Sequence, residues 1–124
     1  MRRAWLRAAG LIALCALAAS HAARAQLWPS YLSNQGLSNQ DLDIMNRETG
    51  DLYRSPDARI GQRKSWLNPA SGNSGTATLV ATPKLRGMSC RRVRYDIHFA
   101  RSQQSRTYSL NWCPTSSNEW RIVD

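Results

Sequence analysis

Two stretches near the end of the chain alternate strictly between apolar and polar side chains. In residues 92–99 every second side chain is apolar, and the same holds for residues 107–112. A period of two is typical of a strand that buries one face and exposes the other. The pattern therefore predicts two half-buried strands, joined as an antiparallel hairpin by a connection near Arg101 and Ser102. This connection lacks the glycine of a tight turn, which indicates a longer loop.

The register of this hairpin follows from its two cysteines. If Cys90 lies opposite Cys113, then Val93 faces Leu110 and Tyr95 faces Tyr108. Apolar residues then meet apolar residues along the whole ladder, and a slip of one residue would destroy the match. The same register predicts a Cys90–Cys113 disulfide on the polar face of the hairpin. Two free thiols are the alternative, and they would require a cytosolic protein.

Residues 38–54 show the spacing of a helix. Ser38 and Asp41 have the separation of a capping box, and apolar side chains then recur at helical intervals from Leu42 onwards. Gly50 weakens the helical pattern, and Pro56 ends it because the residue before proline avoids helical geometry.

The segments that remain predict strands and turns. Residues 63–67 and 76–82 are candidate strands, separated by the turn-forming stretch 68–75 and followed by a turn at 83–87. A last strand carries Trp120 and Ile122 back alongside Trp112 and Leu110. Together the elements predict an α+β fold with one N-terminal helix on a four- to five-stranded antiparallel sheet and one disulfide.

The first 25 residues have the organisation of a signal peptide. A basic start is followed by an apolar stretch over residues 8–19 and by the small-x-small sequence Ala23-Arg24-Ala25. The stretch is too short to span a bilayer, although an uncleaved anchor is the alternative. Leu14 precedes Cys15 where a lipid-modified cysteine needs a small residue, so we expect no lipidation. We expect export to the periplasm, the outer membrane or the cell surface. Residues 38–124 are expected to form the domain, and residues 26–37 an irregular arm that packs its aromatic side chains on it.

The net charge is lower once this leader is set aside. The whole chain carries +9, but the leader holds four arginines and no acidic residue, which leaves +5 for the remainder. Arg92 and Arg94 fall on the polar face of the hairpin and are the candidate anion-binding residues, for an envelope polymer or lipid headgroups. A solvated face with Arg–Asp pairs is the alternative. Arg91 falls on the apolar face opposite Trp112, where we expect either a cation–π contact or an aliphatic stem that lies along the apolar surface with its charged end in solvent. Export argues against nucleic acid as a partner.

Metal and catalytic signatures are scarce in the sequence. Beyond the leader His98 is the single histidine, and no zinc spacing or G-x-S-x-G element occurs, so we expect no metal, no cofactor and no enzymatic activity. A small hydrolase is a rival hypothesis, and it requires a concave pocket that contains His98 and a carboxylate.

Several short motifs resemble one known family in their order and spacing. They are Leu37-Ser38-Asn39-Gln40-Asp41, the stretch W-x-N-P-x-S-G-x-x-G over residues 66–75, Cys90-Arg91-Arg92, Cys113 and residues 118–123. In this order they resemble the C-terminal domain of the bacterial outer-membrane surface antigens, the family of the rickettsial 17-kilodalton surface antigen. Members often carry a lipid-modified cysteine and a glycine-zipper segment, which this chain lacks. The resemblance implies a cell-envelope protein with a structural or binding role. The alternative is a periplasmic inhibitor or immunity-type protein that binds a secreted enzyme.

Overall fold

The computed structural model describes residues 28–123, so the predicted signal peptide and its cleavage site lie outside the described residues. Three helices precede the strands in this part of the chain. They are α1 (Ser30–Asn34), α2 (Asn39–Thr49) and α3 (Asp51–Arg54). The strands are β1 (Arg63–Leu67), β2 (Ser74–Ala81), β3 (Lys84–Leu85), β4 (Met88–Ser89), β5 (Arg91–Phe99), β6 (Gln104–Pro114) and β7 (Trp120–Val123).

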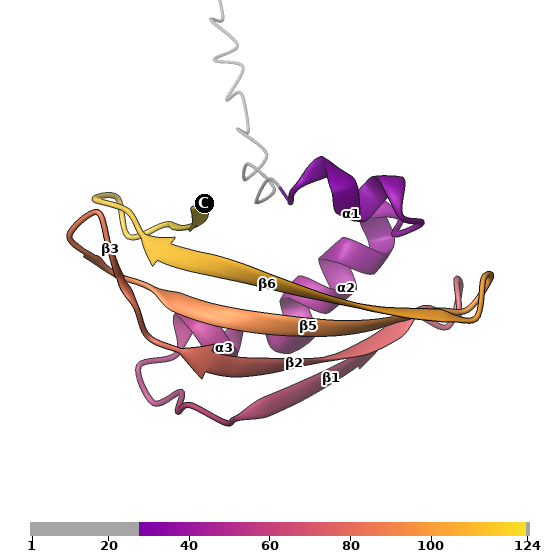
Figure 1. Cartoon of the computed structure of the whole chain (residues 1–124), viewed down its shortest axis with the longest axis horizontal. Helices are drawn as coiled ribbons and strands as arrows, with labels where there is room; N and C mark the ends of the chain where they lie inside the picture. The colour runs from indigo at the N-terminus through magenta and orange to yellow at the C-terminus, as the bar shows by residue number, and fades with distance from the viewer. Residues whose placement is uncertain (1–27, 124) are drawn as a thin grey trace, which may run out of the picture.

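Five of the strands form one antiparallel sheet in the order β1-β2-β5-β6-β7, and β3 and β4 form a separate two-stranded ribbon. Helices α2 and α3 lie behind the sheet in Figure 1 and cover one of its faces. This arrangement confirms the predicted α+β fold. The predicted helix over residues 38–54 is divided at Gly50 into α2 and α3, and the arm predicted to be irregular contains the one-turn helix α1.

The β5–β6 hairpin has the predicted register. Val93 pairs with Leu110, Tyr95 pairs with Tyr108, and the pairing continues without a shift from Arg91 to Phe99. The connection between the strands is four residues long, and Gln103 takes a positive φ of 57° within it. The apolar period and the cysteine pair were therefore together sufficient to place the central hairpin.

Cys90 and Cys113 form the predicted disulfide, with an S–S distance of 2.09 Å and a Cα–Cα distance of 4.2 Å. Strand alternation places it on the polar side of the sheet, as expected. The bond is buried, however, because both cysteines are at most 1% exposed. The segment that carries β3 and β4 folds back here, and the Cys90 N–H donates to the carbonyl of Pro83 at 2.9 Å.

Aromatic rings fill the core between the sheet and the helices. The ring of Tyr53 stacks on Trp112 with centroids 3.9 Å apart, and Trp28 meets Trp112 edge-on at 5.3 Å. Trp112 Nε1 donates to the buried hydroxyl of Tyr95 at 2.9 Å, and burial raises the pKa of Tyr95. The contact of Trp28 confirms that an aromatic residue of the arm packs on the domain.

A buried carboxylate joins α2 to the turn between β1 and β2. Asp41 is fully buried and forms the predicted capping box with Ser38, whose N–H donates to Oδ2 at 2.8 Å. Asn68 donates to Oδ1 at 2.7 Å, Ser71 donates to the same oxygen at 2.6 Å, and Asn73 donates to Oδ2 at 3.0 Å. Burial alone would raise the pKa of Asp41, but these hydrogen bonds outweigh it, and the pKa lies below the usual carboxyl value.

Candidate functional site

One face of the five-stranded sheet is left uncovered by the helices (Figure 1). Residues that lie directly opposite each other in antiparallel strands point to the same side, so the register defines this face. We call it the open face. Its side chains are Arg63, Ser65 and Leu67 of β1, Ser74, Thr76 and Thr78 of β2, Arg92, Arg94, Asp96 and His98 of β5, Ser105, Thr107, Ser109 and Asn111 of β6, and Arg121 and Val123 of β7.

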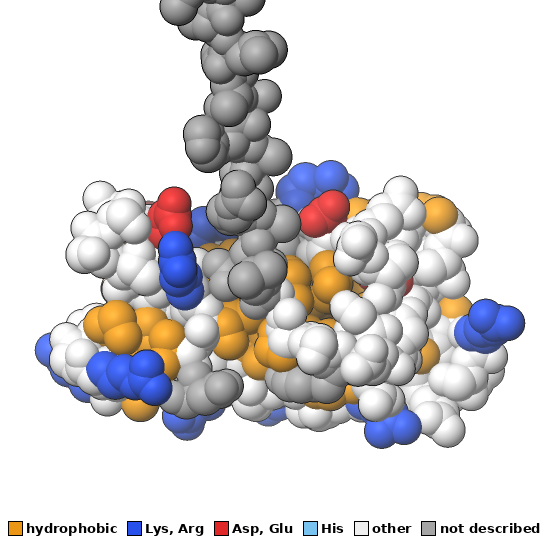
Figure 2. All heavy atoms as spheres, turned by 90° about the horizontal axis from the view of Figure 1, so that it is seen from above, with side chains coloured by type: hydrophobic (Ala, Val, Ile, Leu, Met, Phe, Trp, Pro, Cys, Tyr) orange, Lys and Arg blue, Asp and Glu red, His pale blue; other side chains and the backbone are white. Residues whose placement is uncertain are grey.

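Charge is divided unequally between the helical and the sheet parts of the chain. Residues 28–62 hold three basic and five acidic side chains, whereas residues 63–123 hold ten basic and two acidic ones. Seen from the side of α1 and β6 in Figure 2, Lys and Arg side chains lie around the rim of the molecule and few acidic side chains are visible. The positive charge therefore belongs to the sheet, and the helices are slightly negative.

Three arginines of the open face form what we call the basic stripe: Arg63, Arg92 and Arg94. The register aligns Arg63 with Thr78 and Thr78 with Arg94, so the two arginines flank a central strand at about 10 Å, twice the strand spacing. Arg92 lies about 7 Å from Arg94 along β5. Both arginines predicted to bind an anion thus share one face with a third arginine that sequence reasoning did not include.

The stripe keeps most of its hydrogen-bond donors available. Arg92 Nε donates to Asn111 Oδ1 at 2.9 Å, and Arg94 Nε donates to Asp96 Oδ2 at 3.2 Å. A guanidinium has five N–H donors, and each of these bonds uses one. The Arg94–Asp96 pair is the Arg–Asp pair that the solvated-face alternative expected, but both side chains remain more than 40% exposed, which makes the pair weak.

Thr78 lies between two arginines of the stripe and adds a second polar group to it. The residue is 7% exposed, and its Oγ1 is buried without a hydrogen-bond partner within residues 28–123. A buried hydroxyl without a partner costs about 1–3 kcal/mol.

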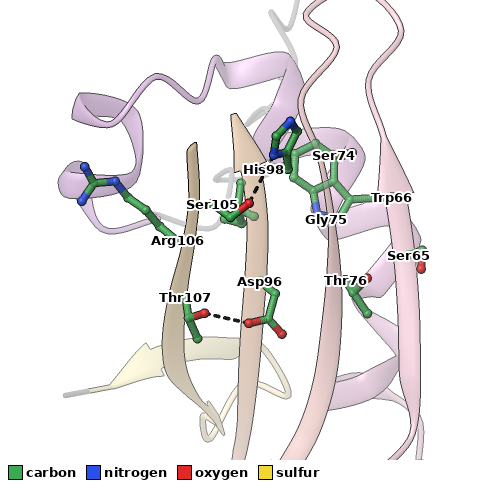
Figure 3. A pocket seen from close by; sticks show the side chains of 11 residues that line it. Ser65, Trp66, Ser74, Gly75, Thr76, Asp96, His98, Ser105, Arg106 and Thr107 are labelled. Atoms are coloured by element: carbon green, nitrogen blue, oxygen red, sulfur yellow. Dashed lines mark hydrogen bonds between the residues drawn. The ribbon is translucent and has the colours of Figure 1, made fainter. Parts of the chain in front are cut away.

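Beside the basic stripe, the open face is hollowed into a depression of about 510 Å³ (Figure 3). Polar residues from four strands line it: Ser65 of β1, Ser74 and Thr76 of β2, Asp96 and His98 of β5, and Ser105, Arg106 and Thr107 of β6. Figure 3 shows two cross-strand hydrogen bonds here, from Thr107 Oγ1 to Asp96 Oδ1 at 2.7 Å and between His98 Nδ1 and Ser105 Oγ at 3.2 Å.

The floor of this depression depends on a glycine. Gly75 pairs with Trp66 across β1 and β2, and a Cβ built on Gly75 would lie 2.5 Å from the Asp96 carbonyl oxygen and 2.7 Å from Trp66 Nε1. Any side chain at position 75 would therefore displace either the indole or the neighbouring strand. The indole itself is 4% exposed and belongs to the core.

The pocket required by the hydrolase hypothesis is present, since His98 and the carboxylate of Asp96 line the same depression. His98 also contacts the hydroxyl of Ser105, which is the pairing of a base with a nucleophile. The described residues show no hydrogen bond between Asp96 and the imidazole, since His98 Nδ1 contacts Ser105 and the Asp96 oxygens accept from Arg94 and Thr107. The geometry is that of a polar binding surface more than that of a triad.

Arg91 lies on the opposite face of the sheet, as predicted, and pairs with Trp112. Its guanidinium lies 5.7 Å from the ring centroid of Trp120 and donates to the carbonyls of Leu52 and Ser55 at the end of α3. A cation at a helix C-terminus compensates the free carbonyls and the helix dipole. The expected cation–π contact is therefore made with Trp120, and Arg91 has a structural role.

Residues 28–123 contain no group of three or more His, Cys, Asp or Glu side chains placed to hold a metal ion. Within the same described range, no helix has the length and apolar character needed to cross a membrane. In comparisons with known proteins, no family model, no curated protein and no solved structure matched the chain.

Proposed function

We propose that the protein is an exported component of the cell envelope that binds an anionic envelope component through the open face, without catalysing a reaction. The observation that carries the proposal is the basic stripe, three arginines grouped on the one sheet face that the helices leave uncovered. Concentrated charge of one sign attracts partners of the opposite sign and raises their local concentration. The disulfide supports export, because such bonds persist in oxidising compartments.

The unequal division of charge between residues 28–62 and 63–123 supports this proposal more strongly than a uniformly basic surface would. Because the acidic side chains gather in residues 28–62, an anionic surface would attract the sheet side and repel the helix side. The molecule would therefore approach an anionic surface in one orientation. Because Arg91 lies on the opposite face, the basic stripe, and not the division of charge alone, assigns the open face as the contact surface.

Cosedimentation with purified peptidoglycan and with phosphatidylglycerol vesicles tests the proposal. Replacing Arg92 and Arg94 together by Gln should weaken binding about tenfold, at roughly 0.7 kcal/mol per exposed charge. The double variant should also show a flatter dependence on salt, since screening acts on the charges that were removed.

The matched control replaces two exposed arginines outside the basic stripe by Gln, Arg47 of α2 and Arg59 of the loop before β1. This variant has the same net charge as the Arg92/Arg94 variant. A difference in binding between the two variants therefore reports the position of the lost charges and not their number. Equal weakening in both variants would contradict a site on the open face. Retention of one stoichiometric protein partner in place of envelope material would instead favour the inhibitor hypothesis.

The contact between His98 and Ser105 keeps a hydrolase as the second candidate function. A fluorophosphonate probe labels a serine that an adjacent base activates, and the test is whether it labels Ser105. We expect no labelling, because no carboxylate oxygen is directed to the imidazole and the pair lies in an open depression. Labelling that is lost in Ser105→Ala and in His98→Gln would establish the enzyme instead.

A further inference from the structure

We infer that the ligand of the open face is an acidic polysaccharide, whose sugar hydroxyls bind in the depression around Asp96 and whose carboxylates bind the basic stripe. This inference rests on the proposed function and names the class of ligand. Two neighbouring features carry it, and their chemistries differ. One offers guanidinium groups and the other offers an array of hydroxyl, carboxylate and imidazole groups (Figure 3).

The carboxylate of Asp96 is the centre of the argument. A surface selected only for anions would exclude an acidic side chain, yet Asp96 lies two residues from Arg94 on the same strand and lines the depression. A carboxylate has about four acceptor positions. Arg94 and Thr107 each occupy one, so Asp96 can still accept hydrogen bonds from hydroxyl donors such as those of a sugar ring.

The surrounding side chains suit the same ligand. Hydroxyl groups both donate and accept hydrogen bonds, and the depression gathers them from three strands, with Ser65 and Thr76 on one side and Ser105 on the other. A sugar ring carries several hydroxyls at its edges and can satisfy such an array. A bare phosphate or sulfate cannot, because it lacks hydroxyl donors when fully ionised.

The spacing of the basic stripe favours a polymer over a single small anion. Arg63 and Arg94 are separated by about 10 Å across the sheet, and Arg92 lies about 7 Å further along β5. A chain of acidic sugars presents carboxylates at regular intervals and can contact more than one of these arginines at a time. The depression also favours a chain over a lipid bilayer, because a flat headgroup surface would not enter it.

Binding to two probes of similar charge tests the inference: a hexamer of galacturonic acid, which carries both carboxylates and hydroxyls, and short-chain polyphosphate, which carries charge alone. The decisive variant is Asp96→Asn. Removal of a negative charge from the open face should leave polyphosphate binding unchanged or tighter. If Asp96 accepts from sugar hydroxyls, the same variant should bind the galacturonate hexamer at least about fivefold more weakly.

Asp96→Asn can also move Arg94, because Asp96 accepts a hydrogen bond from it. A second variant tests the hydroxyl contacts of the depression without touching this pair. Thr76→Val removes a hydroxyl from the depression without changing charge, and it should weaken the hexamer but not polyphosphate. Thr82→Val, at an exposed position outside the depression, is the matched control and should change neither. Melting temperatures of all variants report whether each one is folded.

The outcomes distinguish the inference from the proposed function. If the wild type binds both probes through Arg92 and Arg94, but Asp96→Asn and Thr76→Val leave hexamer binding unchanged, the polysaccharide inference is wrong and anion binding stands. If neither probe binds but the wild type cosediments with peptidoglycan or with the vesicles, the polysaccharide inference is wrong and the proposed function stands; if nothing anionic binds, both fail. Opposite responses of the two probes to Asp96→Asn would support the polysaccharide ligand.

Discussion

The carboxylate of Asp41 accepts a hydrogen bond of 2.7 Å from the side chain of Asn68, 27 residues further along the chain. This bond joins the first turn of α2 to the turn between β1 and β2. The segments 37–41 and 66–75, which lie far apart in the sequence, meet at this point. Asp41 and Asn68 therefore hold the fold together on the side of the sheet away from the basic stripe.

Replacing Asp41 by Asn should lower the free energy of unfolding by about 2–4 kcal/mol at neutral pH, because an amide cannot accept all the bonds that the carboxylate accepts. The folded-state pKa of Asp41 is lowered, so its contribution is fully present above the unfolded pKa of about 4. It is lost as the pH falls through the folded value. Urea denaturation at several pH values measures the free energy of unfolding of the wild type and of Asp41→Asn. The difference between the two values should become smaller below pH 4, and a difference that stays constant with pH would contradict this account.

Gly75→Ala should destabilise the protein by about 2–4 kcal/mol, although alanine is usually tolerated in a strand. The added Cβ would collide with the Asp96 carbonyl oxygen and with the indole of Trp66. Thermal unfolding followed by tryptophan fluorescence measures the effect. Gly87→Ala provides a contrast, since a Cβ there meets nothing within 4 Å and only the positive φ of 75° opposes it. Equal stability of Gly75→Ala and the wild type would show that the packing at Trp66 is looser than described.

Loss of the Cys90–Cys113 disulfide should cost about 2–4 kcal/mol, chiefly by releasing the unfolded chain from a constraint over 23 residues. The variant with both cysteines replaced by Ala should match the wild type under a strong reductant. Cys113→Ser alone should lose at least as much, because it also leaves a thiol and a hydroxyl in a buried site. Free-thiol titration of the oxidised protein should find neither cysteine, and two reactive thiols would exclude the bond.

Replacing Arg91 by Leu keeps an aliphatic side chain at this position. It removes the positive charge and the donors to the carbonyls of Leu52 and Ser55. We expect a loss of about 1–3 kcal/mol from the end of α3, as for other charge-assisted hydrogen bonds. Binding to anionic probes should stay the same apart from a small effect of net charge, because Arg91 lies on the face opposite the basic stripe. A large loss of binding in a folded Arg91→Leu protein would show that the faces are assigned wrongly.

Intact mass of the protein recovered from the producing cell tests the predicted leader. Cleavage after Ala25 gives a chain that begins at Gln26 and carries one disulfide. A mass that includes an acyl-modified Cys15 would contradict both the cleavage site and the absence of lipidation.

The central hairpin could be predicted to the residue because two independent constraints, the apolar period and the cysteine pair, agree on one register. The helix was predicted from Ser38 and Asp41, but its division at Gly50 depends on packing against the sheet. The burial of Cys90 could not be foreseen, since the period-two pattern places it on the polar face and the covering segment is only a few residues long. Arg63 was missed for a related reason: its place beside Arg94 depends on how β1 and β2 pair, and the turn at 68–75 does not determine that register.

The depression was also beyond sequence reasoning, although part of the signal was present. The predicted hairpin register already placed Asp96 opposite Thr107 and His98 opposite Ser105. The lining residues of β1 and β2, among them Ser65, Ser74 and Thr76, join them only through the order of strands β1-β2-β5. Strand order in a sheet reflects long-range packing, and a short apolar period does not encode it.

The most direct test of the central claim is to locate the bound anion on the protein. We would titrate ¹⁵N-labelled protein with the galacturonate hexamer and follow the backbone amide signals. Binding at the open face predicts shifts concentrated on the central strands around Arg92, Arg94 and Asp96, with the signals of α2 unchanged and the shifts suppressed in the Arg92/Arg94 double variant. Shifts concentrated on α2, or spread evenly over the molecule, would contradict the assignment of the open face as the binding surface.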